Sequence, residues 1–262
     1  MTWLYIARVK LTSRHPAAPD QCTRELCRTK SRIWHCWADS SQTLREVVYI
    51  LAESREGQII QELLKDFRGV LVSDFYAAYS AIPCQQQKCL IHLMRDLNDE
   101  ILGNPFDEQM KSIVARFAGL LKPMVDTIDR RGLKRHFLQK HVIEVDRFYK
   151  FLEASDFRSE TALKCKSRFE KNRDTLFTFL HYDGVPWNNN NAEHAIKAFA
   201  GLRDVLSGSA TEASLDDYLT LLSVAETCEY QGLDFLDFLR YEETDIDSFS
   251  RCRGNYRGLH KT

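Results

Sequence analysis

The first third of the chain alternates between hydrophobic patterns typical of strands and of helices. Residues 1–11 show a weak alternation that is compatible with a strand, and a polar, proline-containing stretch follows them. β-branched and aromatic residues predict two further strands at 33–37 and 46–51. A helix is predicted after Gly57, because apolar residues then recur at spacings of three and four. These apolar residues are Ile59, Ile60, Leu63, Leu64 and Phe67. The apolar run at 70–72 predicts a buried strand, so the order strand, strand, helix, strand indicates half of a mixed α/β sheet.

A helical period dominates the chain after Pro83. The first helix there is predicted from the regular spacing of Leu90, Leu93, Leu97 and Ile101. The Gly-Asn-Pro sequence at 103–105 closes it. Residues 106–180 are almost wholly helical in period, with interruptions expected at Pro123 and Gly132. This stretch predicts a helical insertion within the α/β domain.

A run of four asparagines, Asn188–Asn191, precedes the next predicted helix. Asn191 is a good N-cap for it, and Glu193 falls in its first turn. The charge of Glu193 suits the helix dipole there, so a purely structural role is available. Four consecutive asparagines are costly to bury and are suited to binding phosphates or metal-bound water. A final helix is predicted at about 216–239, and the polar tail from Tyr241 is expected to fray.

Composition narrows the class of protein without giving its function. The 262 residues are 44% hydrophobic and 28% charged, as in an ordinary soluble globular protein. No apolar run reaches transmembrane length and no signal-peptide pattern is present, which predicts an intracellular, cytoplasmic protein. The eight cysteines include no CxxC pair, so reduced thiols are expected and a zinc ribbon is not.

Positive charge is concentrated locally, although the formal net charge is −1. Residues 130–173 contain 13 Lys and Arg against 6 Asp and Glu, an excess of 13 − 6 = +7. A solvated helix face accounts for such an excess. The alternative is a surface that follows a phosphate backbone.

Asp74 stands where the apolar run at 70–72 stops, at the predicted carboxyl edge of the sheet. Open α/β sheets bind their ligands along that edge. A carboxylate there can face a metal ion while the strand behind it keeps it rigid. The structural alternative is an aspartate that simply ends the strand in a turn.

Three separated blocks carry a family resemblance. They are LKDFRGVLVSDFYAAYSAI at 64–82, KCLIHLMRDLND at 88–99 and VPWNNNNAEHAIKAFAGLRDV at 185–205. In this order they resemble the transposases of the insertion sequence 66 family, over roughly residues 44–240. That family belongs to the DDE superfamily. The resemblance implies an α/β fold with an RNase H-like mixed sheet, interrupted by a mainly helical insertion.

The resemblance, joined to the patterns above, divides the chain into five parts. They are a divergent amino-terminal segment at 1–31, the first part of the core at 32–104, the helical insertion at 105–180, the second part of the core at 181–240, and a polar tail at 241–262.

The resemblance also implies the chemistry. Asp74 becomes the second acid of the catalytic triad and Glu193 the third, separated by 193 − 74 = 119 residues. Such enzymes cleave phosphodiesters at transposon ends and join strands with two divalent metal ions, Mg²⁺ or Mn²⁺, held by carboxylates. The implied partner is transposon-end DNA, bound by a homodimer or larger assembly, with no membrane and with a location at the nucleoid.

The first acid departs from the family pattern. Relatives carry Asp-Glu-Thr on the opening strand, ahead of the strand that matches 33–37, and no such triplet occurs here. Asp20 lies at a plausible distance, but Pro19 beside it is poor for a central strand, and Asp39 lies in a polar segment. The chain is therefore either a transposase with a displaced acid or a non-catalytic DNA-binding remnant. A helical protein-interaction module is a third reading, which the asparagine run disfavours.

Further residues have supporting roles in this hypothesis. Cys89 and His92, at i and i+3 of a helix, either ligate a metal or support the site with Arg95 by packing. The residues expected to contact DNA are Asn189, Asn190, Lys197 and Arg203.

Overall fold

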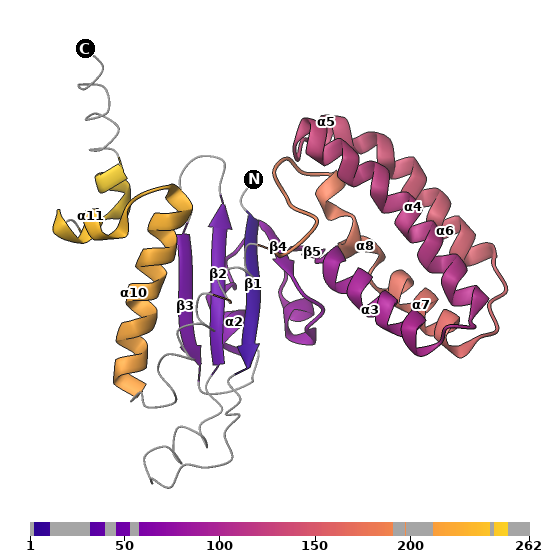
Figure 1. Ribbon diagram of the computed structural model, residues 1–262, viewed down its shortest axis with the longest axis horizontal. Helices are drawn as coiled ribbons and strands as arrows, with labels where there is room; N and C mark the ends of the chain where they lie inside the picture. The colour runs from indigo at the N-terminus through magenta and orange to yellow at the C-terminus, as the bar shows by residue number, and fades with distance from the viewer. Residues whose placement is uncertain are drawn as a thin grey trace, which may run out of the picture. The chain divides into compact units, whose positions relative to one another are not determined.

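The structure is a computed structural model. It describes residues 3–10, 32–39, 46–52, 58–190, 197, 212–241 and 244–250, with side chains over 47–50, 60–190, 197, 214–241 and 244–250 (Figure 1). The chain forms two compact units. The first comprises Met1–Leu4 and Gly57–Asn190, and the second Tyr5–Glu56 and Asn191–Thr262. Together they contain helices and strands, as predicted for an α/β protein.

The first unit contains a parallel pair of strands. β4 (Val70–Ser73) pairs with β5 (Gln85–Lys88), and all four residues of β4 are buried. This confirms the strand predicted at 70–72. The helix predicted after Gly57 is α2 (Gln58–Leu63), but Leu63 is 49% exposed. Its assignment to the apolar face was wrong.

β5 was not predicted, because its sequence Gln-Gln-Gln-Lys has no apolar residue. Buried hydrogen bonds offset the cost of its polarity. The Gln87 side chain donates to the Leu176 carbonyl at 2.8 Å and accepts from the Phe179 amide at 2.9 Å. The prediction that the chain turns helical directly after Pro83 was therefore wrong by one short strand.

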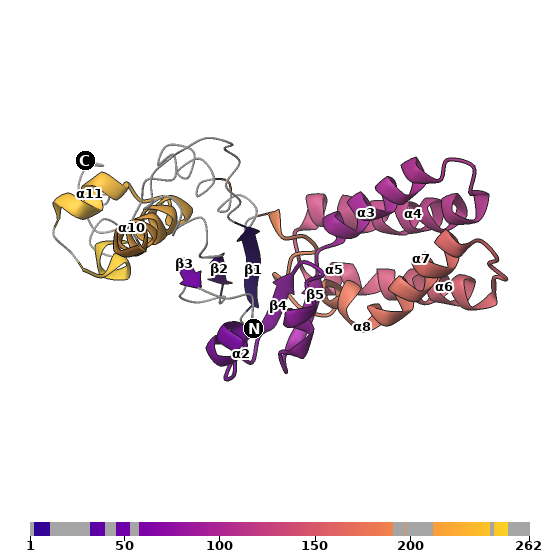
Figure 2. The ribbon, with the colours of Figure 1, turned by 90° about the horizontal axis from the view of Figure 1, so that it is seen from below.

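Helices make up the rest of the first unit. They are α3 (Leu90–Gly103), α4 (Glu108–Arg131), α5 (Arg135–Leu138), α6 (Val142–Ala154), α7 (Glu160–Lys171) and α8 (Arg173–Leu176), with the 3-10 segments η1 (Ala77–Ala81), η2 (Gln139–His141) and η3 (Thr178–Leu180). α3, α4, α6 and α7 lie side by side in both views (Figures 1 and 2). Among these helices, α3 ends where Gly-Asn-Pro predicted.

An aromatic cluster holds the insertion together. The Phe117 ring lies 5.0 Å from that of Phe169 and 6.0 Å from that of Phe148, measured between centroids. The three rings come from α4, α7 and α6, and all are buried. Three helices of the stretch predicted to be helical thus share one aromatic core.

One of the two expected interruptions is absent. Gly132 ends α4 with φ 71°, a value that glycine adopts without strain. Pro123 does not interrupt the helix, which continues through it from Glu108 to Arg131. Pro123 and Gly119, one turn before it, are both exposed. Water can therefore solvate the carbonyl that loses its amide partner.

The second unit contains β2 (Arg32–Asp39), β3 (Glu46–Ala52) and, from Tyr5 onward, β1 (Trp3–Lys10), in the order β3-β2-β1. β2 and β3 are antiparallel, with Trp34 opposite Ile50. All three strands overlap predicted ones, but β2 is longer than the predicted 33–37 and includes Asp39, which was expected in a polar connecting segment.

Helix α10 (Glu212–Gln231) protects the outer strand of this sheet (Figure 1). The Val47 amide donates to the Thr227 hydroxyl at 2.9 Å, and the Tyr49 amide donates to the Ser223 hydroxyl at 3.0 Å. The two hydroxyls lie one helical turn apart on α10, and the two amides lie two residues apart on the same edge of β3. They satisfy backbone groups that an edge strand would otherwise leave open.

The carboxyl-terminal predictions need two corrections. The single helix expected at 216–239 is two, because Gly232, with φ 70°, separates α10 from α11 (Phe235–Arg240). The tail does not simply fray. Residues 246–250 are helical, and Phe249 is buried against Cys228 and Phe238.

Candidate active site

Asp74 directly follows β4, where the buried strand reaches solvent. Ser73 is fully buried, whereas Asp74 is partly exposed. Its Oδ1 accepts a hydrogen bond from the Tyr76 amide at 2.9 Å, which closes a turn. In the described part of the chain no hydrogen bond reaches Oδ2. One carboxylate oxygen therefore shapes the turn, and the other is available to a ligand.

A buried lysine lies behind this carboxylate. Lys88 pairs with Ser73 across the parallel strands, is 2% exposed, and donates to the Ser73 hydroxyl at 3.1 Å. Burial lowers its pKa to about 8, against the opposing effects of Asp74 and Cys84. Sequence reasoning missed Lys88, because β5 itself could not be recognised.

The amino-terminal end of α3 joins the asparagine run to the end of β4. The Cys89 amide donates to the Ser73 carbonyl at 2.8 Å, and the Leu90 amide donates to the Trp187 carbonyl at 3.0 Å. The buried Cys89 sulfur accepts from the Asn189 amide at 3.2 Å. The first two sequence blocks that resemble the family thus meet the start of the third, which is the described part of that block.

The neighbouring residues of the site differ in exposure. Asn189 is fully buried and Asn190 is exposed, with its amide bonded to the Asn188 side chain at 3.1 Å. His92 is partly buried on the first turn of α3, and Arg95 is exposed.

The described residues around Asp74 do not by themselves form a metal site. Within the described ranges, no group of three His, Cys, Asp or Glu residues is arranged to hold a metal ion. Asp74 suits a hard divalent cation as a single carboxylate ligand, since its Oδ2 is open.

A cation from the predicted insertion contacts Phe75, the residue after Asp74. The Arg168 guanidinium, on α7, stacks 4.6 Å from the centroid of the Phe75 ring and forms an ion pair with Asp96. α7 therefore brings an arginine, paired with Asp96, into contact with the residue that follows Asp74. Only the charge excess of residues 130–173 pointed to such a cation, because the sequence does not give the contact between Arg168 and Phe75.

Two other basic residues of the predicted insertion are paired within their own helices. Arg147 contacts Glu144 at 2.5 Å and Lys164 contacts Glu160 at 2.6 Å, each within its own exposed helix face. The solvated-face alternative describes these residues.

Several predicted site residues lie outside the described ranges: Asp20, Glu193 and Arg203. Lys197 is helical and exposed. Their roles stay predictions.

Comparison with known proteins gives one match. A family model described as "Transposase IS66 family" matches residues 21–216, three quarters of the chain. The match includes Asp74 and Glu193, and it begins one residue after Asp20. No curated protein and no solved structure matches the chain. Among the helices that the structure describes, none is long and apolar enough to span a membrane.

Proposed function

The chain belongs to the IS66 family of transposases, and from this we propose that it binds transposon-end DNA through a DDE-type site that retains two acids and lacks the first. The family acts in DNA transposition. In this proposal Asp74 is the second acid and Glu193 the third. The lost first acid makes the chain a DNA-binding transposase with severely impaired cleavage and strand transfer.

The observation that carries the proposal is the position of Asp74. It ends a fully buried strand, keeps one carboxylate oxygen open, and adjoins the asparagine run through Ser73, Cys89 and Asn189. Carboxylates at strand ends are rigid, which metal-dependent phosphodiester chemistry requires.

Glu193 enters the proposal through the asparagine run. It stands three residues after Asn190, the last residue of the described run. The run is anchored to the start of α3, beside Ser73 and hence beside Asp74. A glutamate soon after this anchor is a reasonable second ligand.

Divalent metal ions would be held by Asp74 and Glu193. When bound, they would activate the attacking oxygen and stabilise the leaving one. The chain's own part is to fix the carboxylates. Arg168, which contacts Phe75 and pairs with Asp96, is proposed as a cation for a DNA phosphate. Asn189, Asn190, Lys197 and Arg203 are proposed as DNA contacts, and a homodimer or larger assembly on DNA is the proposed active arrangement.

We infer the loss of the first acid from the composition of the opening strand. β1 reads Trp-Leu-Tyr-Ile-Ala-Arg-Val-Lys and contains no Asp or Glu. In the strand order β3-β2-β1, β1 is the neighbour of the tryptophan-containing β2. It therefore takes the place of the opening strand, on which relatives carry their first acid. Asp39 is the last residue of β2, and Asp20 precedes the matched range. We take the β3-β2-β1 order and the parallel β4–β5 pair as support for an RNase H-like core.

The proposal is tested by nicking of supercoiled DNA with Mg²⁺ or Mn²⁺. Wild type, Asp74→Asn and Asp20→Asn chains would be compared, with binding to a labelled duplex measured in parallel. We expect all three to bind DNA and none to nick above background. Nicking by the wild type that both substitutions abolish would show a complete triad with Asp20 as the first acid. Absence of DNA binding would contradict the DNA-binding function itself.

A further inference from the structure

A second region of positive charge lies at one end of the insertion, away from Asp74 in sequence. Residues 130–141 include no Asp or Glu, and they form the end of α4, α5 and η2. Their basic residues are Arg130, Arg131, Lys134, Arg135 and Lys140. On α6 and α7, Arg147 and Lys164 each pair with a glutamate of the same helix, whereas residues 130–141 contain no acidic residue to balance their positive charge.

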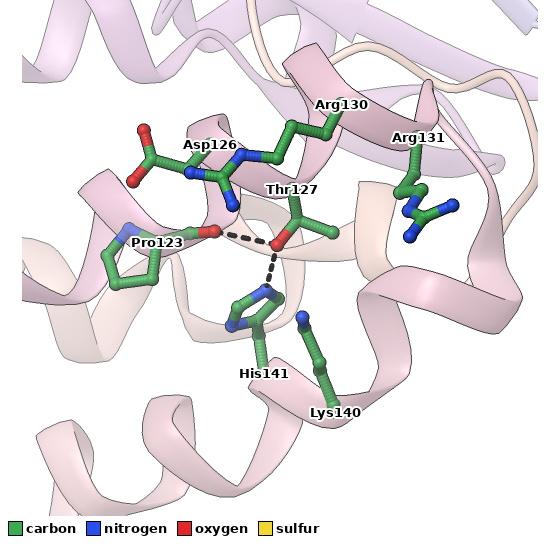
Figure 3. A pocket seen from close by; sticks show the side chains of 7 residues that line it. All are labelled: Pro123, Asp126, Thr127, Arg130, Arg131, Lys140 and His141. Carbon is green, nitrogen blue, oxygen red and sulfur yellow. Dashed lines mark hydrogen bonds between the residues drawn. The ribbon is translucent and has the colours of Figure 1, made fainter.

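This end of the insertion contains a cavity of about 370 Å³ (Figure 3). Its lining residues are Pro123, Asp126, Thr127, Arg130, Arg131, Lys140 and His141. One wall is fixed by hydrogen bonds. The Thr127 hydroxyl donates to the Pro123 carbonyl at 2.8 Å and lies 2.9 Å from His141 Nε2. Thr127 and His141 are both buried, so the wall is built before any ligand arrives.

The cations reach this cavity from two elements. In Figure 3, Arg130 extends from α4 and Lys140 extends from η2 towards the Thr127–His141 pair. Among the described residues neither forms an ion pair, and the same holds for Arg131. Three cations and the Asp126 carboxylate give the lining a net charge of 3 − 1 = +2 with a neutral imidazole.

Two structural explanations account for part of this arrangement. Arg130 and Arg131 lie in the last turn of α4, where positive charge stabilises the helix dipole. The Arg131 guanidinium also lies 5.5 Å from the centroid of the Phe137 ring. Neither explanation applies to Lys140, which comes from a different element and brings its charge to the same cavity.

We propose that this cavity binds a backbone phosphate of DNA through Arg130 and Lys140. A guanidinium and an ammonium are the side chains that best match phosphate oxygens, and the fixed wall lowers the cost of ordering them. The contact is independent of base sequence. The inference rests on the proposed function, because that function supplies DNA as the ligand.

Duplex binding by the full chain tests the proposal, measured by fluorescence anisotropy over a series of salt concentrations. The cavity variant combines Arg130→Gln with Lys140→Gln. The matched control combines Arg147→Gln with Lys164→Gln, which removes the same charge from paired, exposed positions of the same insertion. We expect the cavity variant to lose about fivefold or more in affinity and its salt slope to fall by about 0.9, the value for one lost phosphate contact. The control should lose less than about twofold.

Three outcomes overturn the inference in distinguishable ways. Equal losses in both variants mean that only overall charge matters. Unchanged binding by the cavity variant, with normal binding by the wild type, would show that the cavity does not contact DNA and would leave the proposed function intact. No binding by the wild type contradicts the proposed function and the inference together.

Two further arms keep the result interpretable. The charge-retaining variant Arg130→Lys with Lys140→Arg should bind like the wild type, and a wild-type melting temperature in each variant shows that it folds. Inorganic phosphate is compared with chloride at equal ionic strength by thermal unfolding. Stabilisation by phosphate that the cavity variant loses, with unchanged DNA affinity, would assign the cavity to a small free anion and overturn the DNA contact.

Discussion

At the scale of single residues, Asp74 combines a structural and a chemical task in one carboxylate. Oδ1 accepts the Tyr76 amide, and Oδ2 is open in the described structure. The turn-aspartate reading and the catalytic reading are therefore compatible, since each uses a different oxygen. Substitution can separate them.

Asp74→Asn should keep the turn and lose the charge, because the asparagine carbonyl can accept the same amide. We expect its free energy of unfolding to stay within about 0.5 kcal/mol of the wild type, and that of Asp74→Ala to fall by about 1 kcal/mol. Urea unfolding measures both. Equal destabilisation by the two substitutions would mean that the charge, and not the hydrogen bond, holds the turn.

His141 makes the insertion sensitive to acid. Burial lowers its pKa, with a further contribution from Lys140 and an opposing one from Glu144. The unfolded chain therefore takes up this proton at a higher pH than the folded chain. As a result, stability is full above about pH 6.5 and falls as the pH drops below it.

His141→Gln removes the titration and keeps a side chain able to bond Thr127. Between about pH 7.5 and pH 5 we expect the wild type to lose more stability than this variant. Urea midpoints at the two pH values give the comparison. Other charges around the cavity, including Arg130, Arg131 and Asp126, are common to both proteins. Parallel pH profiles would contradict the assignment.

At the scale of elements, α10 and β3 are joined by side-chain hydroxyls and by apolar packing. Thr227 accepts the Val47 amide and donates to the Val47 carbonyl at 3.2 Å, and both residues are buried. Removing the hydroxyl leaves two buried backbone groups without this partner.

Thr227→Val should therefore cost about 1–3 kcal/mol, the penalty for unsatisfied buried polar groups. Thr220→Val is the matched control on the same helix, because Thr220 is exposed and bonds only within α10. Its cost should be within about 0.5 kcal/mol. Similar losses at the two positions would show that the hydroxyl contact to β3 contributes nothing.

The elements that sequence predicted well are those with a repeating apolar pattern. Among the described side chains, α3 and α4 bury residues at helical spacing, β3 buries the alternate residues Val47 and Tyr49, and β4 is an unbroken apolar run. β5 is buried by virtue of long-range hydrogen bonds from Gln87 to residues about ninety positions away, and no local pattern records such partners. Pro123 was misjudged because local propensity ignores the solvent that surrounds an exposed helix face.

At the scale of the whole molecule, the sequence identified the family motifs but not the contacts that other parts of the chain make with them. Three blocks resemble the family, and the first two meet the start of the third at Ser73, Cys89 and Asn189. Lys88 and Arg168 were missed, because one depends on strand register and the other on the packing of α7 near Phe75. The roles of Asp20, Glu193 and Arg203, which the structure does not describe, remain predictions.

The central claim, that Asp74 and Glu193 hold divalent metal in a transposase site, is tested most directly by titrating the full chain with Mn²⁺ and following free Mn²⁺ by electron paramagnetic resonance. Asp74→Asn and Glu193→Gln should each weaken binding about tenfold or more, and the double variant should add little, because both side chains serve one site. Asp146→Asn, at an exposed position of the insertion, is the control and should bind as the wild type does. Wild-type Mn²⁺ affinity in either Asp74→Asn or Glu193→Gln would contradict the account.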